Sequence, residues 1–358
     1  MLFAQLFLKV AMANKLNIPN ADELIAVITT LLPKIQIYQS TSYELNRKTN
    51  TVQALYIEGN IDKMKAHIKG LLAQIDTCMT SLPEGYKIAH GIEPFTTATK
   101  HEYNTRYTWV GGVTTCSPQQ NLRPAIWTLA CLYLIEYLQG NDRQTLIYDA
   151  LELFEWSSKL KSYSPSDDIN AIVMRTRTPP FMNNQMANGM EFLCLAIINL
   201  SNGKNLEKIY WAYRYAEAAK TQLIAIDKCN GADVHLLNVV NVLYRYAEEW
   251  YKFQLACDYF TDSPDNEALA LDEMNAVITT VSSPKTFPIV IPTMVTEMQR
   301  SFTEYSKQTS SYTFTGVRLA RSYFHAYFSG PVIIPRKTFT PQEKTYDFNN
   351  YISTFSKS

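Results

Sequence analysis

Glycine is scarce in this sequence, with 12 glycines among 358 residues, and no stretch rich in glycine, serine or proline interrupts the chain. Glycine in a helix interior costs about 1 kcal/mol, so scarce glycine together with long periodic segments favours helices. A chain of this length could hold about two domains of ~150 residues each. Because no linker separates two halves, and because hydrophobic residues make up 46% of the chain, the sequence predicts a single folded domain over residues 1–358.

An excess of either charge is also missing, since 33 basic and 33 acidic residues are interspersed along the chain. Proteins that bind nucleic acid usually carry a basic surplus on one face. The balance therefore argues against a nucleic-acid partner and leaves open only a local basic patch.

No hydrophobic run reaches the ~18 residues that a membrane-spanning helix needs. The apolar start lacks the basic residues of a secretion signal, and Gln5 and Lys9 interrupt it. Alternation of Leu6, Leu8 and Val10 instead predicts a short strand. Any membrane contact is thus expected to be indirect or peripheral.

The six cysteines form no pair spaced by two residues and lie mostly in apolar segments. This pattern indicates buried free thiols in a reducing, cytoplasmic compartment, with a disulfide or redox role as the alternative.

Catalytic motifs are absent as well. The sequence contains no phosphate-binding loop, dinucleotide fingerprint, zinc-protease motif or nucleophile elbow, and no two of its five histidines are three or four residues apart. Adjacent carboxylates such as Asp167 and Asp168 point about 100° apart on a helix and fit a helix start better than a catalytic pair. We therefore expect no enzyme, no cofactor and no metal site, although the fold could still bring a cysteine and a histidine together.

Helical periodicity dominates what is present. A helix is predicted from Asp22 to Leu32, a second over residues 34–58 and a third after Asn60, whereas residues 1–20 and 86–120 are expected to form short strands and loops. The region 121–328 is predicted as a helical core with helices over 122–139, 142–162, 168–201, 204–229, 232–261, 265–281 and 290–328. Short Asn-Gly and Ser-Pro turns separate these helices, which predicts a mostly α fold of tetratricopeptide-like hairpins, although no 34-residue repeat is evident. Residues 329–358 are predicted to form an extended arm.

Two groups of side chains allow a functional interpretation beside a structural one. The five tryptophans could form a stacking platform for sugars or bases, but core packing is the simpler interpretation. A basic row could be a solvated helix face or the rim of a groove for an acidic amphipathic partner, and its members are Lys204, Lys208, Arg214 and Lys220.

The order of four segments resembles the Bro-type domain family of ESCRT-associated adaptors, which includes ALIX, rhophilin and BROX. The four are the opening segment 6–10, the helical segment from 43 through Ile75, the Arg-Tyr-Thr-Trp stretch at 106–109 with the apolar segment 125–137, and the aromatic segment 324–331. The resemblance covers nearly the whole chain. It implies a curved, boomerang-shaped helical array with a small N-terminal β-sheet, either as a free-standing domain or as part of a longer protein.

The same resemblance implies a function and a site. The chain would be a cytoplasmic, endosome-associated adaptor that docks the C-terminal amphipathic helix of a Snf-type ESCRT-III subunit in endosomal sorting or membrane remodelling. The partner-binding residues that the resemblance assigns are Met190, Leu193, Ile209, Tyr213, the register alternatives Ala212 and Ala216, and Asp142. Leucine at 193 departs from a family lysine, and tyrosine at 213 departs from an aliphatic anchor. The alternatives are a helical-repeat scaffold for an unrelated partner and a polysaccharide-degrading enzyme built as an α-toroid.

Overall fold

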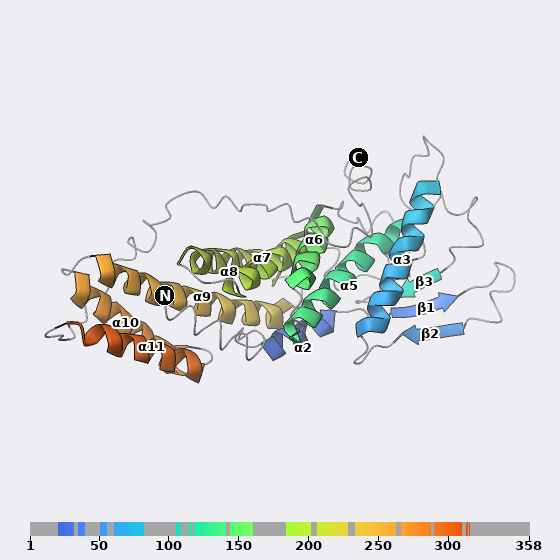
Figure 1. Cartoon of the computed structure of the whole chain (residues 1–358). Helices are drawn as coiled ribbons and strands as arrows, with labels where there is room; N and C mark the ends of the chain where they lie inside the picture. Colours follow the sequence, from blue (N-terminus) through green and yellow to red (C-terminus); the bar gives the residue numbers. More distant parts are fainter. Residues whose placement is uncertain are drawn as a thin grey trace. The chain divides into compact units, whose positions relative to one another are not determined.

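The structure is a computed structural model that describes residues 21–31, 35–39, 51–55, 61–81, 105–108, 114–115, 118–140, 144–159, 184–201, 206–227, 233–262, 266–287, 290–309, 313 and 315 (Figure 1). These residues are mostly helical, as the sequence predicts. The chain divides into two compact units. We call the unit that holds Asp22–Cys194 and Gln222–Leu236 the N-terminal unit, and the unit that holds Leu195–Thr221 and Leu237–Thr338 the C-terminal unit. The prediction of a single domain stays a prediction.

The N-terminal unit contains a four-stranded antiparallel sheet in the order β2-β1-β3-β4. Its strands are β1 (Ile35–Gln39), β2 (Thr51–Leu55), β3 (Thr105–Thr108) and β4 (Thr114–Thr115). The helix predicted over 34–58 is therefore wrong. In β1 the β-branched residues Ile35 and Ile37 alternate with glutamine, and this period of two favours a strand. The strand predicted at 6–10 lies outside the described residues.

Helix α5 (Pro118–Leu138) forms the core of the N-terminal unit. Side chains from Leu122 to Ile135 are buried around the whole helix, as expected for a helix covered on all sides. Helices α3 (Ile61–Ser81) and α6 (Gln144–Lys159) pack on α5. The rings of Trp127 on α5 and Phe154 on α6 meet edge to face at 5.2 Å. The unit also contains α2 (Ala21–Leu31), whose Leu24 and Ile28 are fully buried.

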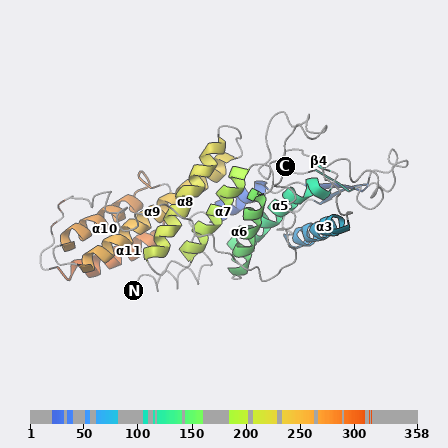
Figure 2. The ribbon, with the colours of Figure 1, turned by 90° about the horizontal axis from the view of Figure 1, so that it is seen from above.

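The C-terminal unit is built from helices alone in its described part. It contains most of α8 (Leu206–Asp227) and α9 (Asp233–Asp262), together with α10 (Glu267–Ser282) and α11 (Pro292–Ser306). The end of α7 (Asn184–Ser201) also belongs to it. Figure 2 shows α8 and α9 side by side. Helix α9 is buried around most of its circumference, so it is the central helix of this unit.

The turn signals in the sequence place most helix ends within a few residues, but one end differs. The helix predicted over 290–328 ends at Ser306, and Lys307 to Thr309 form a turn. Thr303, Ser306 and Thr309 lie close together at this end. Their hydroxyls can hydrogen-bond to nearby backbone groups, which favours the end of a helix. Residues 160–183, 88–104 and the predicted arm at 329–358 lie outside the described part. No helix in the described ranges is long and apolar enough to cross a bilayer.

Candidate functional site

The partner-binding residues that the sequence suggested are placed inside the fold where they are described. Their exposed fractions are 0% for Met190, Leu193, Ala212 and Ala216, 3% for Ile209 and 7% for Tyr213. Asp142 lies outside the described residues. A partner could touch these side chains only if the covering elements moved away, so they do not form an exposed patch. Their role in binding stays a prediction.

Tyr213 nevertheless belongs to a group of aromatic residues that reaches the surface. Two helices supply the group, which we call the tyrosine cluster: Tyr210 and Tyr213 from α8, and Tyr244 and Tyr251 from α9. The ring centres of Tyr213 lie 5.6 Å from Tyr244 and 6.0 Å from Tyr251, and the latter pair is stacked at 5°. Tyr210 lies 5.4 Å from Tyr251.

The four rings fit together because of helical spacing. Positions three apart on α8 share one face, and so do positions seven apart on α9, because seven residues make about two turns. The cluster thus joins about one turn of α8 to two turns of α9. Only Tyr244 is partly exposed, whereas the other three side chains are buried.

Burial and nearby charges raise the pKa of two hydroxyl groups of the cluster. Burial raises the pKa of Tyr213, and the carboxylate of Glu217, the hydroxyl of Tyr244 and the carboxylate of Glu248 raise it further. The Tyr213 and Tyr244 hydroxyls share a hydrogen bond. Burial also raises the pKa of Tyr244, with Glu248 as the next cause. Both hydroxyls are therefore protonated at neutral pH.

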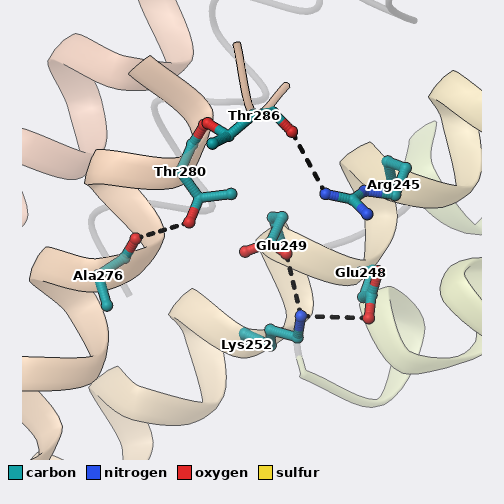
Figure 3. A network of polar contacts seen from close by, with 7 residues as sticks. All are labelled: Arg245, Glu248, Glu249, Lys252, Ala276, Thr280 and Thr286. Carbon is teal, nitrogen blue, oxygen red and sulfur yellow. Dashed lines mark hydrogen bonds and ion pairs between the residues drawn. The ribbon is translucent and has the colours of Figure 1, made fainter. Parts of the chain in front are cut away.

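Charged side chains surround the cluster, and most of them are paired. Arg214 Nε lies 3.2 Å from Glu217 Oε2 on α8. On α9, Lys252 Nζ lies 3.1 Å from Glu248 Oε1 and 2.9 Å from Glu249 Oε1 (Figure 3). These pairs balance the acidic groups near the tyrosines.

Lys220 differs from these cations. Its Nζ lies 4.5 Å from the ring centre of Tyr244, a cation–π contact between α8 and α9. No ion pair joins Lys220 to a carboxylate in the part of the chain that the structure describes. The partly exposed edge of the cluster therefore consists of a phenol ring under an ammonium group.

Another side of α9, about 100° around the helix from Tyr244, is held by the segment between α10 and α11. Arg245 donates to the backbone oxygen of Thr286 at 3.4 Å, and the Thr286 hydroxyl donates to the Thr280 oxygen at 2.7 Å (Figure 3). The same helix thus carries structural contacts towards α10 and the tyrosines towards α8.

Other reactive groups do not converge. No three histidine, cysteine or acidic side chains lie close enough to hold a metal ion among the residues that the structure covers. Cys131, Cys194 and Cys257 are free and buried, which confirms the expectation of buried thiols for these three. Burial raises the pKa of each thiol, so these sulfurs stay protonated and are poor nucleophiles.

The chain matches no protein-family model, no curated protein and no solved structure. The function of the site is therefore inferred from its geometry.

Sequence reasoning found part of this site and missed the rest. It named Tyr213 as an anchor and Lys220 as a rim residue, but it did not single out Tyr244 or Tyr251. The signal was present, because tyrosines seven apart on one helix share a face. What the sequence did not give was the register of α8 on α9, which brings Tyr213 and Lys220 to the same ring.

Proposed function

We propose that this protein is a non-enzymatic adaptor that binds an amphipathic helix of a partner protein on the outer edge of its tyrosine cluster. The observation that carries the proposal is the partly exposed Tyr244, which packs on the buried Tyr213 and is bordered by charged side chains.

Tyrosine supports binding for physical reasons. Its ring supplies a large contact area with few rotatable bonds, and tyrosine is enriched among the residues that dominate interface energies. Packing behind Tyr244 keeps its ring in place before a partner arrives, which lowers the entropy cost of binding. Paired charges at the edge add specificity more than affinity.

The finer proposal concerns the identity of the partner. The resemblance to Bro-type domains supports the C-terminal amphipathic helix of an ESCRT-III subunit, with a role in endosomal sorting or membrane remodelling. It also supports a curved helical array and a cytoplasmic, endosome-associated location. Tyr213, one of the residues that the resemblance assigns to the partner, is buried like the other described ones, but its ring packs against the partly exposed Tyr244. The contact therefore falls on the tyrosine cluster rather than on those side chains.

Titration of labelled helical peptides tests the proposal. Fluorescence anisotropy should detect binding of an ESCRT-III C-terminal helix, and Tyr244→Ala should weaken it at least tenfold. Tyr259→Ala is the matched control, because Tyr259 is a partly exposed tyrosine on the same helix, about 22 Å away at 1.5 Å per residue.

Three outcomes separate the alternatives. Equal losses in Tyr244→Ala and Tyr259→Ala would point to a general destabilisation and remove the proposed surface. Binding of other amphipathic helices but not of the ESCRT-III helix would leave an adaptor with an unrelated partner. Absence of binding to any helix would overturn the proposal.

A further inference from the structure

Tyr244 has a hydrogen-bond donor that the fold does not use. The Tyr213 and Tyr244 hydroxyls share one hydrogen bond, so one of their two protons remains available. The Tyr213 side chain is buried and has no other acceptor among the described residues, so its proton is expected to make this bond, and the remaining proton belongs to the partly exposed Tyr244. None of the described residues accepts it. A partly exposed phenol therefore presents an O–H group towards the outside.

Lys220 presents further donors at the same place. An ammonium group has three N–H donors and no acceptor. The Lys220 ammonium group contacts the face of the Tyr244 ring, 4.5 Å from the ring centre, and this contact uses the charge but no hydrogen-bond acceptor. The neighbouring cations differ from Lys220 because they form ion pairs: Arg214 pairs with Glu217, and Lys252 pairs with Glu248 and Glu249.

We propose that Lys220 and Tyr244 together capture one acidic side chain of the partner's helix, whose carboxylate accepts hydrogen bonds from both. This inference rests on the proposed function and names the chemistry of its partner. A carboxylate has two oxygens and about four acceptor positions, which suits two donors from adjacent helices.

The neighbouring charges select a single carboxylate over a more highly charged ligand. The carboxylates of Glu248 and Glu217 lie close enough to Tyr244 to raise its pKa. Both acids are already paired with Arg214 and Lys252, so the charge of Lys220 balances one carboxylate, whereas a phosphate dianion or a polyanionic surface would leave excess negative charge next to them. An acidic side chain on a protein helix therefore fits better than an anionic lipid head group or a nucleic-acid backbone.

Two conservative variants test this contact. Lys220→Gln removes the charge and keeps most of the stem, and Tyr244→Phe removes the hydroxyl and keeps the ring. A hydrogen bond to a charged group contributes about 1.5–3 kcal/mol, which corresponds to roughly a tenfold to hundredfold change in Kd. Each variant should weaken binding of an ESCRT-III C-terminal helix peptide by about that factor. Lys285→Gln is the control, because Lys285 is exposed on the α10–α11 turn.

A second peptide, with each Asp and Glu replaced by Asn and Gln, completes the cycle. This uncharged peptide should bind the wild type weakly. Its Kd for Lys220→Gln and Tyr244→Phe should be the same as for the wild type. Circular dichroism melts that match the wild type will show that the variants are folded.

The outcomes distinguish the inference from the proposed function. If the ESCRT-III peptide binds with the same Kd to the wild type and to both variants, the carboxylate contact is wrong, but the proposed adaptor function is unaffected. If no helix binds the wild type, the adaptor and this contact fall together. Variants that keep peptide binding but lose phosphatidylserine vesicles or single-stranded DNA would overturn the contact in favour of a lipid or nucleic-acid ligand.

Discussion

A Cβ atom on Gly189 of α7 would lie 3.0 Å from Cδ2 and 3.1 Å from Cγ of Leu223 on α8. This close approach predicts that Gly189→Ala lowers the free energy of unfolding. Alanine would favour the helix by about 1 kcal/mol, but forcing extra volume into a packed contact costs about 1–3 kcal/mol. We expect a net loss of about 1 kcal/mol, measured by urea denaturation followed by circular dichroism.

Gly70→Ala is the matched control on α3, because no atom lies within 4 Å of its added Cβ. That variant should gain up to about 1 kcal/mol from helix propensity alone. If both alanine variants gained stability equally, the tight packing of Leu223 on Gly189 would be wrong.

A substitution at Met190 distinguishes a role of this side chain in the core from a role in partner binding. Its side chain is fully buried, so Met190→Ala should lower the free energy of unfolding by about 2–5 kcal/mol, as large-to-small changes in cores do. Thr221→Ala, an exposed change on α8, should leave stability within about 0.5 kcal/mol of wild type. A Met190→Ala protein that melts like the wild type but loses helix binding would instead support the docking role.

The sequence could predict the helices of the C-terminal unit because local chemistry sets their ends. Asn-Gly at 202–203 and at 230–231 and Ser-Pro at 263–264 lie in the short segments between α7, α8, α9 and α10. Strands β1 and β2 were not predicted, because five residues are too few to distinguish a period of two from a helical one.

The candidate site was less predictable than the helices. Contacts within one helix follow from spacing, as for Arg214 and Glu217. The contact of Lys220 with Tyr244 depends on the crossing and register of α8 and α9, which the packing of many side chains decides together. For the same reason, the resemblance could single out Ile209 and Met190 without telling a core position from an exposed anchor.

Lys252 is predicted to stabilise α9 through two carboxylates that are mostly buried. The side chains of Glu248 and Glu249 are 14% and 6% exposed. Lys252→Met would leave both without their cation, and breaking a buried ion pair costs about 3–5 kcal/mol. Because Lys252 itself is 22% exposed, we expect the low end of this range, about 3 kcal/mol. Glu249→Gln added to Lys252→Met should restore more than half of this loss.

A surface pair provides the comparison for that experiment. Lys159 pairs with Glu155 at 2.6 Å on α6, with side chains 37% and 24% exposed. Lys159→Met should change stability by less than about 0.5 kcal/mol, as exposed helical pairs do. Equal effects of the two lysine substitutions would argue that Glu249 is solvated rather than buried.

Because His67 on α3 has a lowered pKa, we expect the free energy of unfolding to decrease in mild acid. Burial lowers its pKa below the ordinary value of 6.5, so the folded state resists protonation. As the pH falls through 6.5, the unfolded chain takes up the proton first, and the equilibrium shifts towards unfolding until the lower pKa of the folded state is passed. His67→Gln removes this proton uptake. Urea midpoints measured at about pH 7.5 and 5.5 should therefore differ less for the variant than for the wild type, since ordinary carboxyl groups titrate mainly below about pH 5. The same decrease in both proteins would mean that His67 titrates in the folded state as it does in the unfolded chain.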